Sequence, residues 1–446
     1  MKIPQRPPSQ DQLFAEPFDN DRLRRIFEHS QPVDTKGRYL HWDEMRNRKP
    51  PEGLDLREWW FATTFARQSL RRSLPFRSVD GRPFTFSNVD AIQKMVHRID
   101  QQASGQILSD DVTTNLRSSK RYLVSSLIEE AITSSQLEGA STTRRVAKEL
   151  LTSGRKPRDR SETMIANNYA AMLFSQEISG DELSTDSIFE LHRILTQDTL
   201  DNPDSAGRLQ RPEDSRVSVY WNDDTLLHTP PTARELPDRL EKLCRFANSA
   251  DEDEFIHPVV KAIIIHFCLA YDHPFEDGNG RTARALFYRS MLHDGYWLAQ
   301  YISISSILRK APAKYAMSYL YTETDNNDMT YFIIYQLGVI ERAIKSLHDY
   351  LARKITETRE VEQKLQNSSK LNHRQIAVVE KALRDSGGSF TIASQQTRHR
   401  VTYQTARTDL LELEEFGLLK KNRVSNKFVF RPVPEIAERL RDLGTS

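Results

Sequence analysis

The residues with the clearest chemical potential lie in one short stretch, from His273 to Arg284, which reads HPFEDGNGRTAR. It contains an imidazole that could act as a base, a carboxylate that could bind a metal ion, two glycines and two arginines. Gly278 and Gly280 can adopt backbone angles that aim successive N–H groups at an oxyanion, and a following helix would add its positive end. Arginines in a first helical turn oppose the helix dipole unless a bound anion compensates them. The stretch therefore predicts that a phosphate chain binds here.

The same stretch resembles the signature of the Fic family, H-x-F-x-[DE]-G-N-G-R-x-x-R, and matches it at every fixed position. The resemblance implies a protein adenylyltransferase that transfers AMP from ATP to a Ser, Thr or Tyr hydroxyl of a target protein or of itself. His273 would be the general base, which suits an imidazole because it titrates near neutral pH. Asp277 would hold Mg²⁺, a hard cation that prefers oxygen ligands. The resemblance assigns the phosphates of ATP to Gly278, Asn279, Gly280, Arg281 and Arg284, the last at the γ-phosphate.

A second motif lies far upstream, where residues 134–139 read SSQLEG. It resembles the inhibitory motif [ST]-x-x-x-E-[GN] of many Fic proteins, here N-terminal to the catalytic loop, which is the class II arrangement. The resemblance makes Ser134 and Glu138 inhibitory residues, with Glu138 paired to Arg284. ATP could then enter, but its α-phosphate would be misaligned, and a small misplacement of reacting atoms costs orders of magnitude in rate. The alternative is that Glu138 is one more solvated carboxylate.

Two short β-prone runs, 217–221 and 225–229, are separated by turn-forming residues and predict a hairpin. In Fic proteins a comparable flap holds the target segment as an added strand. The resemblance therefore assigns target positioning to Val217, Val219 and Tyr220. The alternative is an ordinary surface hairpin.

Two nearby assignments are less direct. Residues 207–211 resemble the family's G-x-x-R with one residue extra, which leaves the role of Arg211 open. Tyr315 stands where relatives often place an aromatic residue near the adenine, and an aromatic ring could bind a purine by stacking. Core packing is the alternative for Tyr315.

The elements that position these residues are predicted to be helices. Pro258 suits a first helical turn, and apolar residues follow at helical spacing up to Tyr271, so a buried helix should deliver His273. The first fifty residues are rich in Pro, Asp and Arg and are expected to be extended. The same periodicity predicts further helices at residues 56–71, 87–102, 121–133, 141–151, 161–176, 185–195, 232–248 and 331–354.

The fold class predicted from these segments is mainly α, in four parts. They are a helical N-terminal extension over residues 1–105, a helical Fic core with a small β-hairpin flap over 106–353, a linker helix over 354–370 and a winged helix-turn-helix domain over 371–446.

The last part has its own pattern and charge. Helices are predicted at residues 371–384, 391–399 and 402–416, followed by strands at 418–423 and 427–430, and this order resembles a winged helix-turn-helix. Residues 395–431 carry eight basic and four acidic side chains, a net charge of +4, which could meet the phosphates of DNA. The acidic side chains of the third helix would repel DNA. A protein-binding or dimer-forming module therefore stays open as the alternative.

Composition limits the setting. The chain has 446 residues, 38% of them hydrophobic, and a net charge of +1, which suits two or three domains with real cores and argues against a wholesale polyanion binder. No apolar run approaches membrane-spanning length and the first ten residues lack the apolar centre of a signal peptide, so a cytoplasmic location without a membrane partner is expected. Cys244 and Cys268 do not make a disulfide scaffold. The family resemblance suggests a homodimer through the core or the N-terminal extension.

Two classes of function stay open. In the first, the chain is an autoinhibited AMP transferase whose winged helix selects targets or location. In the second, it is chiefly a DNA-binding transcriptional regulator whose Fic core senses a nucleotide. The presence of both His273 and Asp277 favours catalysis, because a sensor could bind ATP without a base. Within the enzyme class, another phosphate donor, or removal of AMP with the help of Glu138, is also open.

Overall fold

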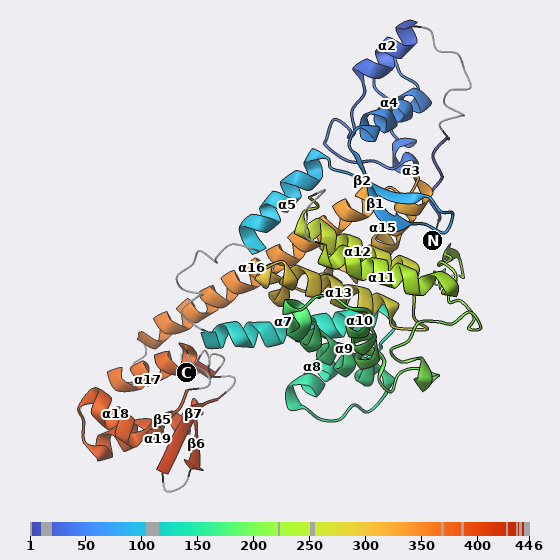
Figure 1. Cartoon of the computed structure of the whole chain (residues 1–446). Helices are drawn as coiled ribbons and strands as arrows, with labels where there is room; N and C mark the ends of the chain where they lie inside the picture. The colour runs from blue at the N-terminus through green and yellow to red at the C-terminus, as the bar shows by residue number, and fades with distance from the viewer. Residues whose placement is uncertain are drawn as a thin grey trace. The chain divides into compact units, whose positions relative to one another are not determined.

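The computed structural model describes residues 2–9, 20–103, 116–221, 224–249, 255–366, 370–384, 388–424, 427–433, 436 and 439–440. The chain divides into two compact units, the first made of Met1–Leu108 and Tyr122–Ile344 and the second of Ser109–Arg121 and Lys345–Ser446. Helices dominate both units, as the predicted fold class requires (Figure 1). The predicted domain boundary at residue 105 lies outside the described residues. Among the helices described, none is long and apolar enough to cross a membrane.

The centre of the first unit is the pair of helices on either side of the predicted catalytic loop. α12 (Pro258–Asp272) and α13 (Asn279–His293) pack against each other along their length (Figure 1). Every residue of α12 except Pro258 and Ala270 is buried, as expected for a helix that is apolar on nearly all sides. The helices packed around this pair are α7 (Leu116–Leu137), α8 (Arg144–Ser153), α9 (Arg160–Glu177), α10 (Thr185–Thr196) and α11 (Leu236–Asn248).

The connections of this bundle carry the remaining elements. β3 (Val219–Tyr220) and β4 (Leu226–His228) pair antiparallel, so the predicted hairpin is confirmed, although Asn222 and Asp223 of its turn lie outside the described residues. α16 (Thr330–Gln366) is longer than the predicted helix and continues through most of the predicted linker. The other connecting helices are η1 (Ile178–Gly180), η2 (Pro203–Ser205), η3 (Ala233–Glu235), η4 (Trp297–Tyr301), α14 (Ile304–Leu308) and α15 (Pro312–Thr324).

The N-terminal segment corrects one prediction. The first fifty residues are not simply extended, because α2 (Asn20–Glu28) and α3 (Trp42–Met45) are helical. α3 is short but capped: Nδ1 of His41 accepts from the amide of Asp43, and Glu44 accepts from the amide of His41. The segment continues through α4 (Leu56–Gln68), the antiparallel strands β1 (Arg71–Arg77) and β2 (Pro83–Ser87), and α5 (Asp90–Ala103).

A buried arginine joins this segment to the helical bundle. The guanidinium of Arg67 is fully buried and donates to the hydroxyl of Tyr331 at 2.9 Å and to the carbonyls of Leu40 at 2.9 Å and Pro32 at 3.0 Å. It also lies 3.5 Å from the ring centroid of Tyr39. A buried charge without partners is strongly destabilising. The N-terminal segment and the start of α16, up to Ile344, therefore belong to one folded unit.

Besides parts of α7 and α16, the described part of the second unit includes three helices and a small sheet. α17 (His373–Arg384), α18 (Ile392–His399) and α19 (Tyr403–Glu415) enclose an apolar core with an antiparallel sheet of order β5-β7-β6. The strands are β5 (Phe390–Thr391), β6 (Leu419–Val424) and β7 (Lys427–Pro432). The elements follow the predicted order of three helices and two strands, with β5 as an added strand. The winged-helix assignment itself stays a prediction.

Candidate active site

The predicted catalytic loop makes a tight connection between α12 and α13. His273 ends α12 in the left-handed conformation, with φ of +46°, and Gly278, with φ of +82°, precedes the first residue of α13. A Cβ at Gly278 would lie 2.9 Å from Cγ2 of Thr196, so both backbone and space require glycine. Asn279 clamps the loop, because Oδ1 accepts from the amide of Phe275 at 2.9 Å and Nδ2 donates to its carbonyl at 2.8 Å. The side chain of Asn279 thus fixes the shape of the loop.

His192 of α10 supports the loop from the interior of the bundle. Its ring stacks on Phe275 with the centroids 3.8 Å apart, and its Nε2 donates to the carbonyl of Asp277 at 2.9 Å. Its Nδ1 accepts from the amide of Gly207 at 2.9 Å, which requires a neutral ring. Burial favours the same state and lowers the pKa of His192 to about 4.

Arg216 holds the start of the loop at the end of α12. Its guanidinium donates to the carbonyl of Asp272 at 2.8 Å and to the carbonyl of His273 at 3.0 Å. These carbonyls belong to the negative end of the helix, and no N–H group of the helix is available to bond them. Arg216 also donates to the side-chain oxygen of Gln210, and the backbone N–H of Gln210 donates to the carbonyl of Pro274 at 2.9 Å. The backbone around His273 is therefore held on both sides.

The imidazole of His273 is poised as a base. Its Nδ1 donates to the carbonyl of Ala270 at 3.3 Å, so the lone pair is on Nε2. The ring is half-buried, and burial lowers the pKa of His273 to about 4. The ring is consequently neutral at pH 7, which is the state that accepts a proton.

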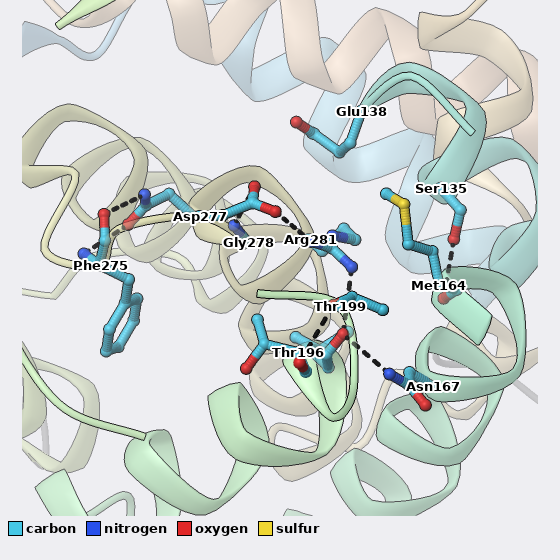
Figure 2. Close-up of polar contacts among 12 residues, drawn as sticks. Ser135, Glu138, Met164, Asn167, Thr196, Thr199, Phe275, Asp277, Gly278 and Arg281 are labelled. Atoms are coloured by element: carbon cyan, nitrogen blue, oxygen red, sulfur yellow. Dashed lines mark hydrogen bonds and ion pairs between the residues drawn. The ribbon is translucent and has the colours of Figure 1, made fainter. Parts of the chain in front are cut away.

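The carboxylate of Asp277 lies beside the loop with 41% of its side chain exposed. Oδ1 accepts from the amide of Gly278 at 2.6 Å, and Oδ2 lies 3.2 Å from Arg281 (Figure 2). Oδ2 also lies 3.9 Å from Arg160. Mg²⁺ is usually bound by one or two carboxylates together with waters and substrate phosphates, so one exposed carboxylate fits a magnesium ion that arrives with a nucleotide. Within the described ranges no group of three or more His, Cys, Asp or Glu residues could hold a metal by itself.

Arg281 is placed differently from the phosphate ligand that the sequence predicts. Its side chain is 0% exposed, and its guanidinium donates to the carbonyl of Leu195 at 3.1 Å and to Asp277 at 3.2 Å. Its Nε has no partner in the part of the chain that the structure describes. Arg281 therefore braces Asp277 from inside the bundle, and its contact with ATP stays a prediction.

The N-terminus of α13 is built to receive an anion. Gly278 supplies no side-chain cap, so the first amides of α13 have no partner from the preceding residue and carry the positive end of the helix. A Cβ at Gly280 would collide with the carboxylate of Glu138 and would lie 3.0 Å from Nη1 of Arg284. The carboxylate of Glu138 thus lies directly against the start of this helix.

Arg284 is the partner of that carboxylate. Its Nη2 donates to Glu138 at 2.8 Å and to the carbonyl of Ser134 at 3.1 Å, and its Nε donates to the hydroxyl of Ser134 at 2.9 Å. Burial opposes the charge of the fully buried guanidinium, but the nearby charge of Glu138 outweighs it and raises the pKa of Arg284. The structure brings Ser134, Glu138 and Arg284 together across 146 to 150 residues of sequence.

Tyr315 also contacts this group. Its hydroxyl lies 2.9 Å from Nε2 of His266 and 3.2 Å from the hydroxyl of Tyr319, and it is hydrogen-bonded to Arg284. Its ring is nearly parallel to that of Tyr335, with the centroids 6.4 Å apart. The hydroxyl of Tyr315 therefore faces Arg284, and stacking of its ring on adenine stays a prediction.

The two strands of the flap differ: β3 is partly exposed, whereas β4 is bonded to the helical bundle. In β3, Tyr220 is 59% exposed and Val219 is half-buried, while Val217 precedes the strand. In β4, Nδ1 of His228 lies 2.9 Å from Glu323 of α15 and Nε2 lies 2.7 Å from the carbonyl of Tyr271. Both partners are acceptors, so both ring nitrogens donate and the ring is a cation.

The pKa of His228 agrees with this geometry. Burial alone would lower it, but the hydrogen bond and the charge of Glu323 raise the pKa above its ordinary value. The flap is thereby tied to the last turn of α12, two residues before His273.

Three positioning residues escaped prediction from the sequence: His192, Arg216 and His228. None belongs to a motif, and each contacts the loop or the end of α12 from another part of the chain. The one available signal was the G-x-x-R resemblance, which pointed to Arg211. That residue is exposed, and its amide donates to Asp214 at 2.8 Å, whereas Arg216 makes the contacts with the loop.

The fold and site together define a helical protein in which an imidazole, a carboxylate and an uncapped helix start share one loop. Comparison with known families agrees, because residues 182–291 match the model of the Fic/DOC family. The chain therefore contains a Fic domain.

Curated relatives match the same region. The protein adenylyltransferase Fic of Nematostella vectensis is 32% identical over 116 residues, which is 26% of this chain and 24% of that protein. The protein adenylyltransferase fic-1 of Caenorhabditis elegans is 34% identical over 117 residues, or 26% of this chain and 20% of that protein. The chain thus matches only about a quarter of the length of these relatives, as their coverage shows.

The fold is similar to that of a solved structure. A crystal structure of a Fic family protein from Desulfovibrio desulfuricans G20 superimposes with a TM-score of 0.54, covering 81% of this chain and 99% of that one. Since the sequences are 16% identical, this likeness concerns the fold alone.

Proposed function

We propose that this chain is a protein adenylyltransferase that transfers AMP from ATP to a hydroxyl group of a target protein or of itself. The observation that carries the proposal is the carboxylate of Glu138, which lies against the start of α13 and pairs with Arg284. An anionic group is already accepted at this position, and the neutral imidazole of His273 is in the adjoining loop. The names of the relatives that match the Fic domain support the same chemistry.

The reaction follows from the state of His273. A target hydroxyl attacks the α-phosphorus of ATP, so a new O–P bond forms while the bond from that phosphorus to the bridging oxygen breaks. The hydroxyl proton passes to Nε2 of His273, and pyrophosphate leaves. The hydrogen bond from Nδ1 to Ala270 keeps the accepting lone pair on Nε2. The amides at the start of α13 would bind the phosphates, as helix N-termini do.

Asp277 would hold Mg²⁺ in this reaction. The ion would neutralise charge on the departing pyrophosphate when it is bound. The bonds from Gly278 and Arg281 fix the direction of the Asp277 carboxylate, so the chain supplies one oriented oxygen ligand.

The contacts of Glu138 support autoinhibition. Arg284 is the residue that the family resemblance assigns to the γ-phosphate, and here Glu138 and Ser134 take up its donors. ATP would have to bind without that partner, or displace Glu138. Either outcome disfavours an α-phosphate aligned for attack.

The hairpin supports delivery of the target by main-chain pairing. β3 and β4 are only two and three residues long, and Tyr220 on β3 is largely exposed. An extended target segment could add to the edge of such a flap with little demand on its sequence.

The test is AMP transfer measured by intact mass after incubation with ATP and Mg²⁺. Glu138→Gly should gain the mass of AMP on itself, because Arg284 and the start of α13 become available. The rate should rise by at least about tenfold, since 1.4 kcal/mol corresponds to that factor and the guanidinium released from the ion pair is buried. Glu138 lies in a turn after α7, so glycine does not interrupt a helix.

Two further variants make the test specific. His273→Ala in the Glu138→Gly background should abolish the transfer, because the base is gone. Glu182→Gly, which removes an exposed carboxylate from another loop, should behave as the parent does. Failure of Glu138→Gly to transfer AMP faster than the parent would contradict autoinhibition, and transfer that survives His273→Ala would contradict the mechanism.

A further inference from the structure

The second unit carries a basic surface whose charges are not used within the fold. Six cations are exposed on α19, at the end of α18 and on β6 and β7. None of them forms an ion pair with another described residue. They are Arg398, Arg400, Arg407, Lys420, Arg423 and Arg431.

Two of these cations face each other. Lys420 of β6 and Arg431 of β7 are directly opposite in the antiparallel register, and both are exposed. Like charges at opposite positions of a sheet destabilise it unless something neutralises them. Such a pair therefore indicates an anion that comes from outside the chain.

The acidic residues of α19 are the main argument against binding of a polyanion. In the structure, most of these carboxylates are bonded to other side chains of the unit. Asp409 is buried and accepts from Asn372 at 2.7 Å and from Arg374 at 2.7 Å and 3.1 Å. Glu412 accepts from Gln375 at 2.5 Å. Both carboxylates are thus neutralised or bonded toward α17.

The other two acidic residues lie at the far end of α19. Glu414 pairs with Lys421 at 3.4 Å, and Glu415 is the last residue of the helix. Twelve residues separate Tyr403 from Glu415, which corresponds to about 18 Å along a helix. The first half of α19 is therefore remote from the exposed carboxylate of Glu415 at the other end of the helix.

That first half presents side chains suited to base edges. Tyr403, Gln404, Arg407 and Thr408 are exposed and recur at helical spacing on one side of α19. Glutamine can bond adenine and arginine can bond guanine through two hydrogen bonds each, and the major groove of DNA admits a helix. α19 packs against β6, so the exposed helix face and the basic strands belong to the same part of the unit.

We infer that the second unit binds duplex DNA, with the first half of α19 in the major groove and Lys420, Arg423 and Arg431 on the flanking phosphates. The turn that joins α18 to α19 spans three residues, Arg400 to Thr402, which suits a helix-turn-helix. This activity does not depend on AMP transfer. The protein would carry its Fic domain to DNA.

The test is fluorescence anisotropy of the full-length chain with a labelled duplex of mixed sequence, over a series of salt concentrations. The logarithm of the binding constant should fall linearly with the logarithm of the salt concentration. Lys420→Gln with Arg431→Gln should weaken binding and reduce the salt slope by about 2, since each lost phosphate contact reduces it by about 1. Arg57→Gln with Lys94→Gln is the matched control, because it removes two exposed charges from the first unit.

Base reading is tested by selection from a randomised duplex library. The parent should enrich a consensus sequence. Gln404→Ala should reduce the preference for the consensus base at one position by roughly 5- to 150-fold. Circular dichroism and thermal melting check that each variant is folded.

Three results would overturn the inference. The first is that the folded parent does not bind duplex DNA. The second is that the Lys420→Gln, Arg431→Gln variant and the control variant lose binding equally. The third is that the parent binds the single strand of the same sequence with equal affinity. The first would leave the basic surface to an acidic protein partner, and the third would exclude docking in a groove.

Discussion

Each chemical group of the candidate site depends on a neighbour that is distant in sequence. His192 bonds the backbone of Asp277, Arg216 bonds the carbonyl of His273, and Ser134 with Glu138 bonds Arg284. Such bonds hold the reacting groups without touching a substrate. Errors of about 1 Å in such positions cost rate by a factor of about 100. A change at any of these partners should therefore be felt at the catalytic loop.

The low pKa of His273 gives a prediction about pH. Because burial lowers the pKa to about 4, the base is fully neutral well below the usual value of 6.5 for histidine. The kcat/KM for AMP transfer by the Glu138→Gly variant should stay level from about pH 7.5 down to about pH 5.5, as far as His273 is concerned. Loss of Glu138 removes a charge that raises the pKa, so it shifts the acid limb lower still.

The measurement is initial rate of AMP transfer at several pH values and constant ionic strength. A half-maximal rate near pH 6.5 would contradict the prediction, because it would show an imidazole in contact with water. The same measurement on His273→Ala in the Glu138→Gly background gives the rate of AMP transfer without the base.

At the scale of elements, the hairpin is tied to the bundle by a charged histidine. The ring of His228 donates to Glu323 and to the carbonyl of Tyr271, so β4, α15 and the end of α12 meet at one side chain. Hydrogen bonds to charged groups contribute about 1.5–3 kcal/mol each. The flap should thus open less readily than its short strands suggest.

Hydrogen exchange can test this contact without any assay of activity. Glu323→Gln removes the negative charge but keeps an acceptor, so amides of β3 and β4 should exchange at least about tenfold faster in the variant. Rising pH should lower the protection factors of the same amides in the parent, because the raised pKa of His228 means that its proton is lost only above the ordinary value. The extra protection is present at low pH and is lost as pH rises through the pKa of the folded state.

Glu235→Gln is the matched control, since Glu235 is a nearby carboxylate on η3 with 48% of its side chain exposed. Unchanged exchange in Glu323→Gln, or an equal change in Glu235→Gln, would show that the ion pair does not hold the flap.

At the scale of the whole molecule, the first unit buries several histidines in the neutral state. Burial is the main cause, and it lowers the pKa of His192 and His273 to about 4 and that of His41 and His266 to about 3. Their unfolded values lie near 6.5, so between about pH 6.5 and 4 the unfolded chain binds more protons than the folded one. Asp272 opposes this trend, because burial raises its pKa to about 6.

The first unit should therefore lose stability in mild acid. Each histidine contributes up to about 1.4 kcal/mol for each pH unit below its unfolded pKa, and Asp272 offsets one of the four. Urea unfolding at pH 7, 6 and 5 checks this, with tryptophan fluorescence as the signal, since all five tryptophans belong to the first unit. If the urea concentration at the unfolding midpoint did not decrease from pH 7 to pH 5, the assignment of neutral buried rings would be contradicted.

The extent of prediction from sequence differs between elements. Helices such as α9, α10 and α12 were placed to within one or two residues, because apolar residues recur in each at three- and four-residue intervals over several turns. α2 was not predicted: its sequence NDRLRRIFE has apolar residues at helical spacing, Leu23, Ile26 and Phe27, but it is only nine residues long and lies in a segment rich in Pro, Asp and Arg. β5 was missed for a similar reason, since two residues cannot show a period of two.

The sequence by itself determined the chemistry of the loop from His273 to Arg284, since catalytic residue types at fixed spacing are a local property of the chain. The family resemblance of residues 134–139 also pointed to Glu138 as the partner of Arg284. Only the tertiary structure decided which histidine and which arginine support the loop, and which cations of the second unit form no ion pair with another described residue. The physical reason is that each of these contacts joins segments far apart in the chain. Their meeting depends on how the helices pack, which no local pattern of residues records.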